Sequence, residues 1–353
     1  MKVKTTKFAY LEQNHVAKIG ERALPEELGP HQVLLHMLGN NLCTTDYQHW
    51  MGLREHQGYP MAGGHEGEGV VIEIGSEVTH VKEGDKVAIN GYGACGMCEN
   101  CRNGYTFACT NPTTGGRSAD GYLGGFGMAQ YNVVNEEQLF VMNPDLEPCE
   151  AGFLEPISTV CSGIEMLRLK PHETVLVIGA GTMGLANAQV AKAFGGRVAI
   201  SELMQNKVDT ARSMGFAVCK SDEEDIEEFT KEFTNGKGFD CVILAVSNKF
   251  VIDQAQTLIK KIGGRILFFA AGYPAPESVL KANDIHYRRI ELIGTMGANT
   301  RDFQTAAMLL NTRAIDVKPM CEPEQFELDD IQAAFEAAST PGMYRVHVKI
   351  TEE

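Results

Sequence analysis

The chain has 353 residues, 44% of them hydrophobic and 22% charged, so it can bury a large core in one long or two ordinary domains. Its formal net charge of −15 disfavours binding to nucleic acid or to an anionic membrane, because both carry negative charge. Residues 1–20 lack the basic flank and apolar run of a signal peptide, and no apolar run approaches about 18 residues. We therefore expect a cytoplasmic protein that binds small molecules and other copies of itself.

The first part of the chain has the pattern of short β-strands separated by glycine and polar residues. Its apolar segments are Val33–Met37, Gly69–Gly75 and Lys86–Ile89. Short strands separated in this way are typical of a barrel-like β domain.

From about residue 155 the pattern changes to apolar strands alternating with helical periodicity, which indicates βαβ units and a parallel sheet. The predicted strands are Thr174–Ile178, Arg197–Ile200, Cys241–Leu244 and Arg265–Phe269. The alternation fades after Ile290–Gly294, and a helix near Asp302–Leu310 leads to a last β-like segment, Tyr344–Ile350, which is expected to return to the first domain. The acidic run Ser221–Glu228 is predicted to lie on a solvated helix face.

A glycine-rich turn follows the first strand of this second part. Gly179, Gly181 and Gly184 match the pattern G-x-G-x-x-G, in which glycines permit a tight turn and let a helix N-terminus face a pyrophosphate. The next strand ends at Glu202, about 20 residues further on, where a carboxylate can bind both ribose hydroxyls and repels a 2′-phosphate. The pattern predicts NAD rather than NADP; the alternative is a glycine-rich turn beside an unrelated surface glutamate.

Four of the ten cysteines are clustered in one short segment, residues 95–109. They are Cys95, Cys98, Cys101 and Cys109, with the spacing C-x₂-C-x₂-C-x₇-C. Four thiolates can close a tetrahedral site around Zn²⁺ and leave no position for a substrate, which predicts a structural zinc. An iron–sulfur cluster and a redox-active cysteine pair are the alternatives, and the acidic charge disfavours a nucleic-acid-binding zinc ribbon.

A second set of possible metal ligands lies outside that segment. Cys43 provides a thiolate, His65 an imidazole, and Glu66 and Glu155 two carboxylates. An open zinc site needs three such ligands and one free position. Each of these residues alone is more typical of a core cysteine or a hydrogen-bonded histidine, so the prediction depends on the set as a whole.

Together these motifs resemble the zinc-containing medium-chain dehydrogenase/reductase family, in the style of sorbitol, threonine and galactitol-phosphate dehydrogenases. The resemblance covers essentially the whole chain and depends on four features, namely Gly64-His65-Glu66 followed by Gly69 and Val71, the segment Gly84–Val87, the four-cysteine loop and the dinucleotide turn. It implies an α/β fold in three parts: a GroES-like β-barrel catalytic domain over residues 1–155, a doubly wound Rossmann domain that binds NAD over 156–289, and a return to the catalytic domain over 290–353.

The resemblance also implies roles for the second metal set. Cys43, His65 and Glu155 would hold a catalytic zinc, and Glu66 would be a further ligand or would exchange with water or substrate. Asp46 would orient His65 through a hydrogen bond. With the four-cysteine site, this implies two zinc ions per chain.

Other residues match the family at the proton path and the cofactor. Thr45 matches a hydroxyl that passes the substrate proton outward, Lys207 a lysine at the adenosine ribose, and Arg345 a basic residue near the pyrophosphate. For Lys207 and Arg345 a plain surface charge is the alternative. The histidine that many relatives carry five residues after the first cysteine is replaced by Gln48, with His49 one position later. The sequence therefore does not identify the residues through which the proton leaves.

The substrate pocket departs from the sorbitol type. The segment Gly294–Asn299 lacks the arginine that such a pocket places near Gly297 to hold polyol hydroxyls. Trp50, Met51 and Met296 are candidates for an apolar pocket, although such residues are more often core. The substrate could therefore be less polar than sorbitol.

The implied function is hydride transfer between a secondary alcohol, such as a polyol or sugar alcohol, and NAD. A physiological NADH-dependent reductase of a bulkier apolar ketone is one alternative, since the same site works in both directions. A zinc- and nucleotide-binding protein without catalysis is another. The expected partner is a small alcohol or ketone, with no nucleic acid and no membrane, and a homo-oligomer, dimer or tetramer, is expected.

Overall fold

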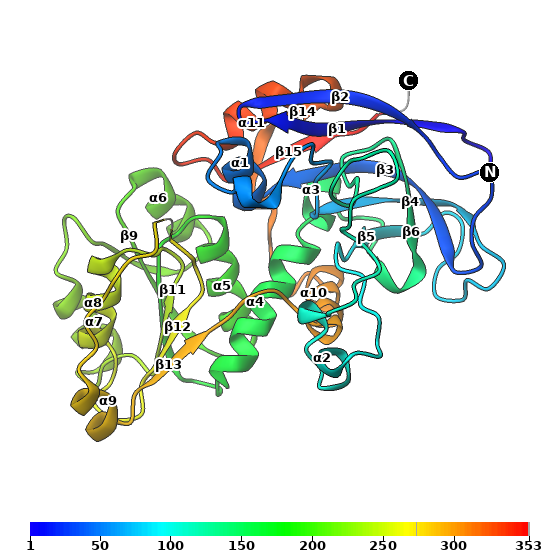
Figure 1. Cartoon of the computed structure of the whole chain (residues 1–353). Helices are drawn as coiled ribbons and strands as arrows, with labels where there is room; N and C mark the ends of the chain where they lie inside the picture. The colour runs from blue at the N-terminus through cyan, green and yellow to red at the C-terminus, as the bar shows by residue number, and fades with distance from the viewer. Residues whose placement is uncertain (273, 352–353) are drawn as a thin grey trace. The chain divides into compact units, whose positions relative to one another are not determined.

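The computed structural model describes residues 1–272 and 274–351, which form two compact units (Figure 1). Unit 1 comprises Met1–Ser158 and Ala298–Glu353, and unit 2 comprises Thr159–Gly297. The division expected at residue 155 falls inside helix α4 (Leu154–Leu167), which runs through it without a break. The division expected at 289 comes slightly too early, because β13 (Glu291–Gly294) still pairs with a strand of unit 2.

Unit 2 is a six-stranded sheet in which every pair of neighbours is parallel, in the order β10-β9-β8-β11-β12-β13. Besides β13, its strands are β8 (Thr174–Ile178), β9 (Arg197–Glu202), β10 (Ala217–Lys220), β11 (Cys241–Leu244) and β12 (Arg265–Phe268). Its helices, besides the greater part of α4, are α5 (Thr182–Ala193), α6 (Gln205–Ser213), α7 (Ile226–Thr234), α8 (Lys249–Leu258) and α9 (Ala282–Arg288).

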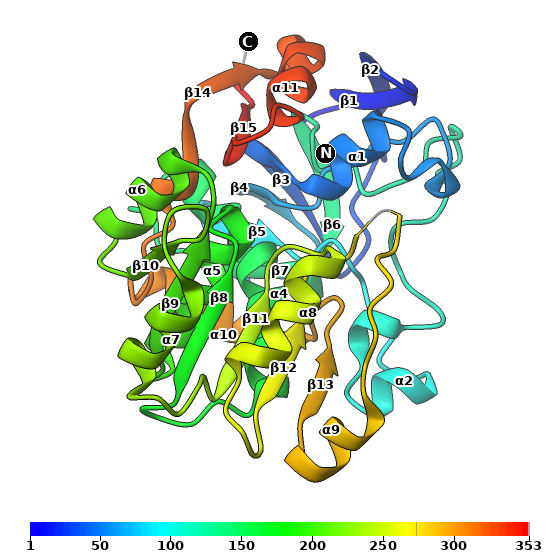
Figure 2. The same ribbon diagram turned by 90° about the vertical axis from the view of Figure 1, so that its left-hand side faces the viewer.

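Helices cover both faces of this sheet. Helices α7 and α8 lie in front of the strands in Figure 2, and α5 lies on the opposite side of β11 in Figure 1. Because neither face of the central strands meets water, β8 and β11 are apolar and buried at every position or nearly so. This confirms the predicted doubly wound α/β architecture.

Unit 1 is built on a seven-stranded mixed sheet in the order β14-β15-β3-β4-β5-β7, with β6 paired to β3, and on a separate hairpin of β1 and β2. The strands are β1 (Thr5–Gln13), β2 (Val16–Ala23), β3 (Gln32–Leu42), β4 (Gly67–Ile74), β5 (Lys86–Ile89), β6 (Tyr131–Asn135), β7 (Leu139–Val141), β14 (Cys321–Glu327) and β15 (Arg345–Lys349). The α-helices are α1 (Thr44–Trp50), α2 (Glu99–Arg102), α3 (Pro148–Ala151), α10 (Thr300–Asn311) and α11 (Ile331–Ala338). Single 3₁₀ turns are η1 (Glu55–Gln57), η2 (Thr106–Ala108), η3 (Glu136–Gln138), η4 (Lys318–Met320) and η5 (Leu328–Asp330).

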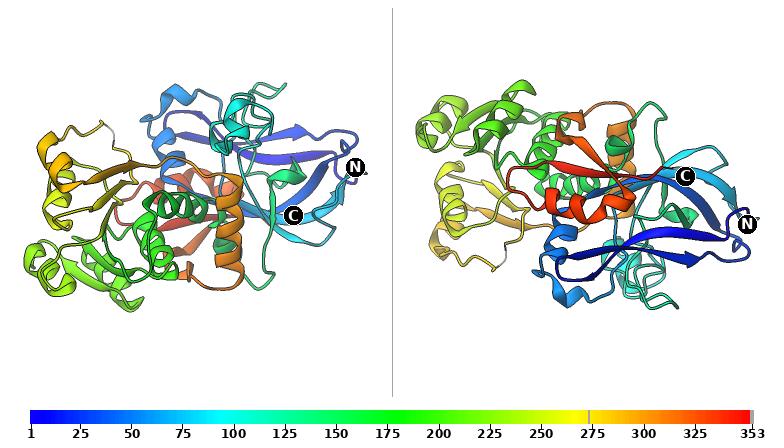
Figure 3. Two further views of the ribbon diagram at one scale, coloured as in Figure 1. Left: turned by 90° about the horizontal axis from the view of Figure 1, so that it is seen from below. Right: turned by 90° about the horizontal axis from the view of Figure 1, so that it is seen from above.

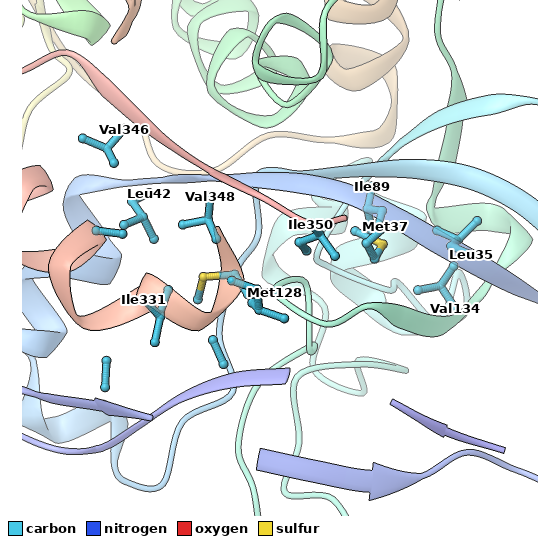
Figure 4. Close-up of a cluster of buried hydrophobic side chains, with 14 of the residues drawn as sticks. Leu35, Met37, Leu42, Ile89, Met128, Val134, Ile331, Val346, Val348 and Ile350 are labelled. Atoms are coloured by element: carbon cyan, nitrogen blue, oxygen red, sulfur yellow. The ribbon is translucent and has the colours of Figure 1, made fainter. Parts of the chain in front are cut away.

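The apolar core of unit 1 joins the two ends of the chain. Strand β15 adds to the sheet beside β3, and α11 lies next to the β1–β2 hairpin when the molecule is seen from above (Figure 3). Val346 and Val348 of β15 pack with Leu42 and Ile331 in one buried cluster (Figure 4). Side chains alternate along a strand, so the intervening residues of β15 face the other side of the sheet, where the candidate site lies.

The C-terminal segment thus returns to the first domain, and the predicted GroES-like domain is confirmed. The predicted helix near Asp302–Leu310 is α10, and Asp302 accepts a hydrogen bond from the Asn299 N–H at 2.8 Å to cap it. No helix among residues 1–272 and 274–351 is both long and apolar enough to cross a membrane.

Candidate active site

Three predicted metal ligands meet at one edge of the unit 1 sheet. Cys43 follows β3 directly and is the N-cap of α1, while His65 and Glu66 directly precede β4. Because β3 and β4 are antiparallel neighbours, the end of one strand lies beside the start of the other. The Cys43 Sγ, a ring nitrogen of His65 and a carboxylate oxygen of Glu66 all lie within 4.8 Å of one another. One thiolate, one imidazole and one carboxylate suit a zinc ion and leave room for a further ligand.

Asp46 lies between two of these ligands. Its Oδ2 accepts a hydrogen bond from the Cys43 N–H at 2.9 Å, and its Oδ1 lies 3.5 Å from His65 Nδ1. Burial opposes a charged imidazole, but the Asp46 carboxylate outweighs it and raises the pKa of His65. A carboxylate in this position holds one ring nitrogen and leaves the other for a metal, as many metal-bound histidines require.

Arg345 of β15 reaches the same group from the neighbouring strand. Its Nε donates to Glu66 Oε2 at 2.8 Å, and its Nη2 donates to Glu66 Oε1 at 2.6 Å and to Cys43 Sγ at 3.6 Å. Burial alone would raise the pKa of the Cys43 thiol, but Arg345 and His65 outweigh it and lower this pKa to about 7. The site therefore favours the thiolate, which is the form that binds metals.

Glu155 lies in the first turn of α4, outside the group of three. Burial raises the pKa of its carboxyl to about 7, and the charges of His65, Glu66 and Arg345 also act on it. Its carboxylate is thus near enough to interact electrostatically with the group. Its role as a zinc ligand stays a prediction.

The four clustered cysteines form a second group, with all four sulfur atoms within 4.8 Å of one another. Backbone N–H groups point at these sulfurs: the N–H of Cys98 donates to Cys95 Sγ at 3.4 Å, and the N–H of Cys101 donates to Cys98 Sγ at 3.5 Å. The latter bond is the main reason that the pKa of Cys98 is lowered to about 5. The donor set fits a closed tetrahedral zinc site with no open position.

The predicted dinucleotide turn lies in unit 2 between β8 and α5, with Gly181 as the N-cap of α5. Gly179 has a φ of +100°, and a Cβ on Gly184 would overlap the Gly179 carbonyl oxygen, so these two positions require glycine. Glu202 ends β9, and its Oε2 accepts a hydrogen bond from the Ala180 N–H at 2.6 Å. A Cβ built on Gly181 would lie 3.6 Å from Lys207 Nζ. The predicted cofactor residues of unit 2 thus surround one helix N-terminus.

Comparisons with known proteins decide the family. Residues 29–144 match the alcohol dehydrogenase GroES-like domain, and residues 182–312 match the zinc-binding dehydrogenase domain. An alcohol dehydrogenase of Rhizobium meliloti is 30% identical over 302 residues, which cover 82% of this chain and 85% of the relative. The chain belongs to the zinc-dependent medium-chain dehydrogenase family.

One further relative and one solved structure are also similar to this chain. A sorbitol dehydrogenase of Halalkalibacterium halodurans is 28% identical over 306 residues, covering 84% of this chain and 85% of the relative. A zinc-binding dehydrogenase of Sinorhizobium meliloti, solved with NADP, has the same fold with a TM-score of 0.84 at 24% identity, covering 98% and 100% of the two chains. The protein is thus an alcohol oxidoreductase that uses zinc and a nicotinamide cofactor.

Helix α1 carries the residues expected on the proton path. Thr45 lies in its first turn, and Gln48 Oε1 accepts a hydrogen bond from Arg54 Nε at 3.0 Å. His49 is 2% exposed, with its ring centroid 4.6 Å from that of Tyr59. Gln48 and His49 are therefore both held by neighbouring side chains. These contacts do not identify the residues through which the proton leaves.

Of the two alternatives for Trp50, a pocket residue or a core residue, the structure supports the core residue. Trp50 is 6% exposed and belongs to the apolar core of unit 1, where its ring stacks on Phe335 at a centroid distance of 6.2 Å. Met51 and Met296 are 39% and 73% exposed. Arg345, expected near the pyrophosphate, is only 4% exposed because Glu66 binds it, and its contact with a pyrophosphate stays a prediction.

Two structural features near the site were not evident from sequence patterns. Cys149 of α3 and Cys321 of β14 form a disulfide, which no spacing rule predicts because 172 positions separate the two residues. Glu68 and His347 are fully buried polar residues on the sheet face of the metal site. The one available signal for Glu68 was a glutamate among the glycine and apolar residues at the start of β4.

Proposed function

We propose that the protein oxidises a secondary alcohol, such as a polyol or sugar alcohol, with NAD⁺, at a zinc ion held by Cys43, His65 and Glu155. The observation that carries the proposal is the convergence of Cys43, His65 and Glu66 within 4.8 Å, with the charge of Glu155 acting on the same group. Bound there, zinc supplies a Lewis acid that polarises the alcohol oxygen.

The chain's own residues supply the remaining tasks. Asp46 holds Cys43 and His65 in position, and Arg345 offsets negative charge on Cys43 and Glu66. Thr45 is proposed to accept the hydroxyl proton and pass it outward. Because Arg345 binds both carboxylate oxygens of Glu66, we propose that Glu66 is held in reserve and ligates zinc only when Arg345 releases it.

NAD is proposed over NADP because of Glu202. Its carboxylate lies at the glycine turn, where it can accept hydrogen bonds from both hydroxyls of a ribose and repels a 2′-phosphate. No arginine follows at positions 203–206 to bind a phosphate. Lys207 is proposed to contact the adenosine ribose.

For the substrate, the absence of an arginine in Gly294–Asn299 argues against sorbitol itself. The reverse reaction, reduction of a bulkier ketone by NADH, uses the same residues and is the second direction to test. The cytoplasmic location and the homo-oligomeric state stay predictions.

A screen of alcohols with NAD⁺, and of ketones with NADH, followed by NADH absorbance, tests the proposal. We expect turnover with at least one secondary alcohol, loss of turnover in Cys43→Ser, and unchanged turnover in Cys219→Ser, a matched control at a buried cysteine of β10. A folded, zinc-loaded protein without turnover on any substrate of a broad panel would contradict the proposal.

A further inference from the structure

Two pairs of polar side chains cross the same face of the unit 1 sheet. Arg345 and His347 are two positions apart on β15, and Glu66 and Glu68 are two positions apart at the start of β4, so each strand presents both of its residues on one face. The outer pair is Arg345 with Glu66, beside Cys43. The inner pair is His347 with Glu68, whose Nε2 and Oε1 atoms are 3.8 Å apart and whose side chains are 1% and 0% exposed.

Two glycines provide the space that the inner pair occupies. His347 pairs with Asn41 and Glu68 with Gly39, so the inner pair must reach across β3. A Cβ on Gly39 would overlap the Nε2 atom of His347. A Cβ on Gly152, after α3, would lie 2.8 Å from Glu68 Oε2 and 2.7 Å from the Glu66 carbonyl oxygen. A side chain at either glycine would displace the inner pair.

Asn41 connects the inner pair to the outer one. Its Oδ1 lies 2.9 Å from His347 Nδ1, and its Nδ2 donates to the Cys149 carbonyl at 3.0 Å. Its backbone N–H donates to the Glu66 carbonyl at 3.2 Å. A change in the position of His347 therefore acts on Asn41 and, through it, on the backbone of Glu66. It also acts on Arg345 through the short strand segment between them.

The polar inner pair is energetically unfavourable in this buried space. Among the described residues, no atom hydrogen-bonds to either carboxylate oxygen of Glu68 or to Nε2 of His347. Burying such groups opposes folding, and apolar residues of similar volume at both positions are commonly neutral or stabilising. Stability alone therefore does not favour the inner pair. Its position, two residues from the outer pair on each strand, points to a role in the geometry of the site.

We propose that Glu68 and His347 are positioning residues that fix the Arg345–Glu66 pair, and with it the geometry of the zinc site. This inference depends on the proposed function, because it concerns the same metal. Among the described residues, no hydrogen bond joins the side chains of the inner pair to Cys43, His65 or Glu66. The pair acts through Asn41 and through the strands that carry Arg345 and Glu66.

The test is the double variant Glu68→Met/His347→Leu, which fills the space with apolar side chains. We expect its urea midpoint to equal or exceed that of the unmodified protein. We also expect zinc affinity at the open site, measured by competition with a chelator, to fall about tenfold or more, as for other residues that support metal ligands. The visible spectrum of cobalt at the open site should change, after subtraction of the spectrum of Cys43→Ser, in which only the four-cysteine site contributes.

Two controls separate positioning from general stability. Glu68→Gln keeps the shape of the inner pair and can donate to His347, so it should restore the unmodified spectrum and affinity. Asn132→Leu, on β6, removes a hydrogen bond of 2.9 Å to the Gly125 carbonyl and should lower stability without changing the cobalt spectrum. If the double variant does not fold, the single variants His347→Gln and Glu68→Gln are compared instead. We then expect a changed cobalt spectrum for His347→Gln and an unchanged one for Glu68→Gln.

The inference is overturned if the folded double variant keeps the unmodified cobalt spectrum and zinc affinity, or if Asn132→Leu changes them equally. It is also overturned if His347→Gln, as the replacement, leaves both unchanged. An unmodified protein with no cobalt spectrum beyond that of Cys43→Ser would contradict the proposed function instead, so the two failures are distinguishable.

Discussion

The Arg345 guanidinium and the Glu66 carboxylate form a bidentate ion pair, with N–O distances of 2.8 and 2.6 Å and exposures of 4% and 1%. Fork-to-fork pairing fixes both side chains in one plane. Since the same guanidinium donates to Cys43 Sγ, this pair also controls the charge at the candidate metal site. The charge balance of the site is therefore shared between two strands, β15 and the start of β4.

Removing one partner of this ion pair is expected to destabilise the protein strongly. Arg345→Met leaves the Glu66 carboxylate buried without compensation, which costs about 3–5 kcal/mol of unfolding free energy. Arg345→Met/Glu66→Met should recover most of that loss, since neither charge remains. Urea unfolding of both variants in zinc-free buffer measures the difference. Equal stability of the single and double variants would contradict the expected penalty for an uncompensated Glu66 carboxylate.

The two cysteine sites are expected to respond differently to mutation. Elemental analysis should find two zinc ions in the unmodified chain, one for each group of ligands. Cys43→Ser should give a folded, NAD-binding, inactive chain with one zinc, because an open site contributes mainly to catalysis. Cys98→Ser should chiefly impair folding, because a closed four-thiolate site contributes folding free energy directly. A fully active unmodified chain with one zinc, after mild purification, would refute the two-site assignment.

Glu202 is expected to select NAD over NADP. Hydrogen bonds to a charged carboxylate contribute about 1.5–3 kcal/mol each, so Glu202→Ser should lower the preference for NAD in kcat/KM by roughly tenfold or more. Glu227→Ser, at an exposed acid on α7, changes the net charge equally and should leave the preference intact. The ratio of kcat/KM values for the two cofactors is the measurement. An unmodified enzyme equally efficient with both would rule out this role of Glu202.

Acid is expected to destabilise the fold through His347. Burial, followed by the charge of Lys349, lowers the pKa of this imidazole from 6.5 to about 4. The unfolded chain therefore binds a proton more readily than the folded chain. The contribution of His347 to stability is fully present above about pH 6.5 and is lost as the pH falls towards 4. Between about pH 7.5 and 5.5 the loss due to this group is on the order of 1 kcal/mol. Unfolding free energies at both values should fall less in His347→Leu; equal pH dependence would contradict the assignment.

Sequence periodicity predicted the fold because both sheets follow simple patterns. Parallel strands covered on both faces are continuous apolar runs, and each such run, from Thr174–Ile178 to Ile290–Gly294, is a strand of unit 2. Only the last part of the acidic run Ser221–Glu228 lies on a helix. Lys220 binds Asp222 and Glu223 in a turn, and the Asp225 side chain caps α7, which begins at Ile226.

The two groups of candidate metal ligands could be predicted in part. Cysteine spacing indicated the four-cysteine group, and the family resemblance pointed to Cys43, His65 and Glu66. Contacts between distant segments could not be predicted. The positions of Arg345 and His347 beside Glu66 and Glu68 depend on β15 returning next to β3, and no local pattern encodes the pairing His347–Asn41. Sequence patterns could not decide between core and pocket for Trp50 for the same reason, since its partner Phe335 lies on α11 near the other end of the chain.

The most direct test of the account is zinc restoration at the open site. Chelator treatment should remove zinc held by Cys43 and His65 before zinc held by four thiolates, and NAD⁺-dependent oxidation of the best secondary alcohol should stop. We predict that one added equivalent of zinc restores NADH formation in the unmodified protein and in Cys219→Ser, but not in Cys43→Ser. Full turnover by the chelated protein, or restoration of turnover in Cys43→Ser, would contradict catalysis by zinc at this site.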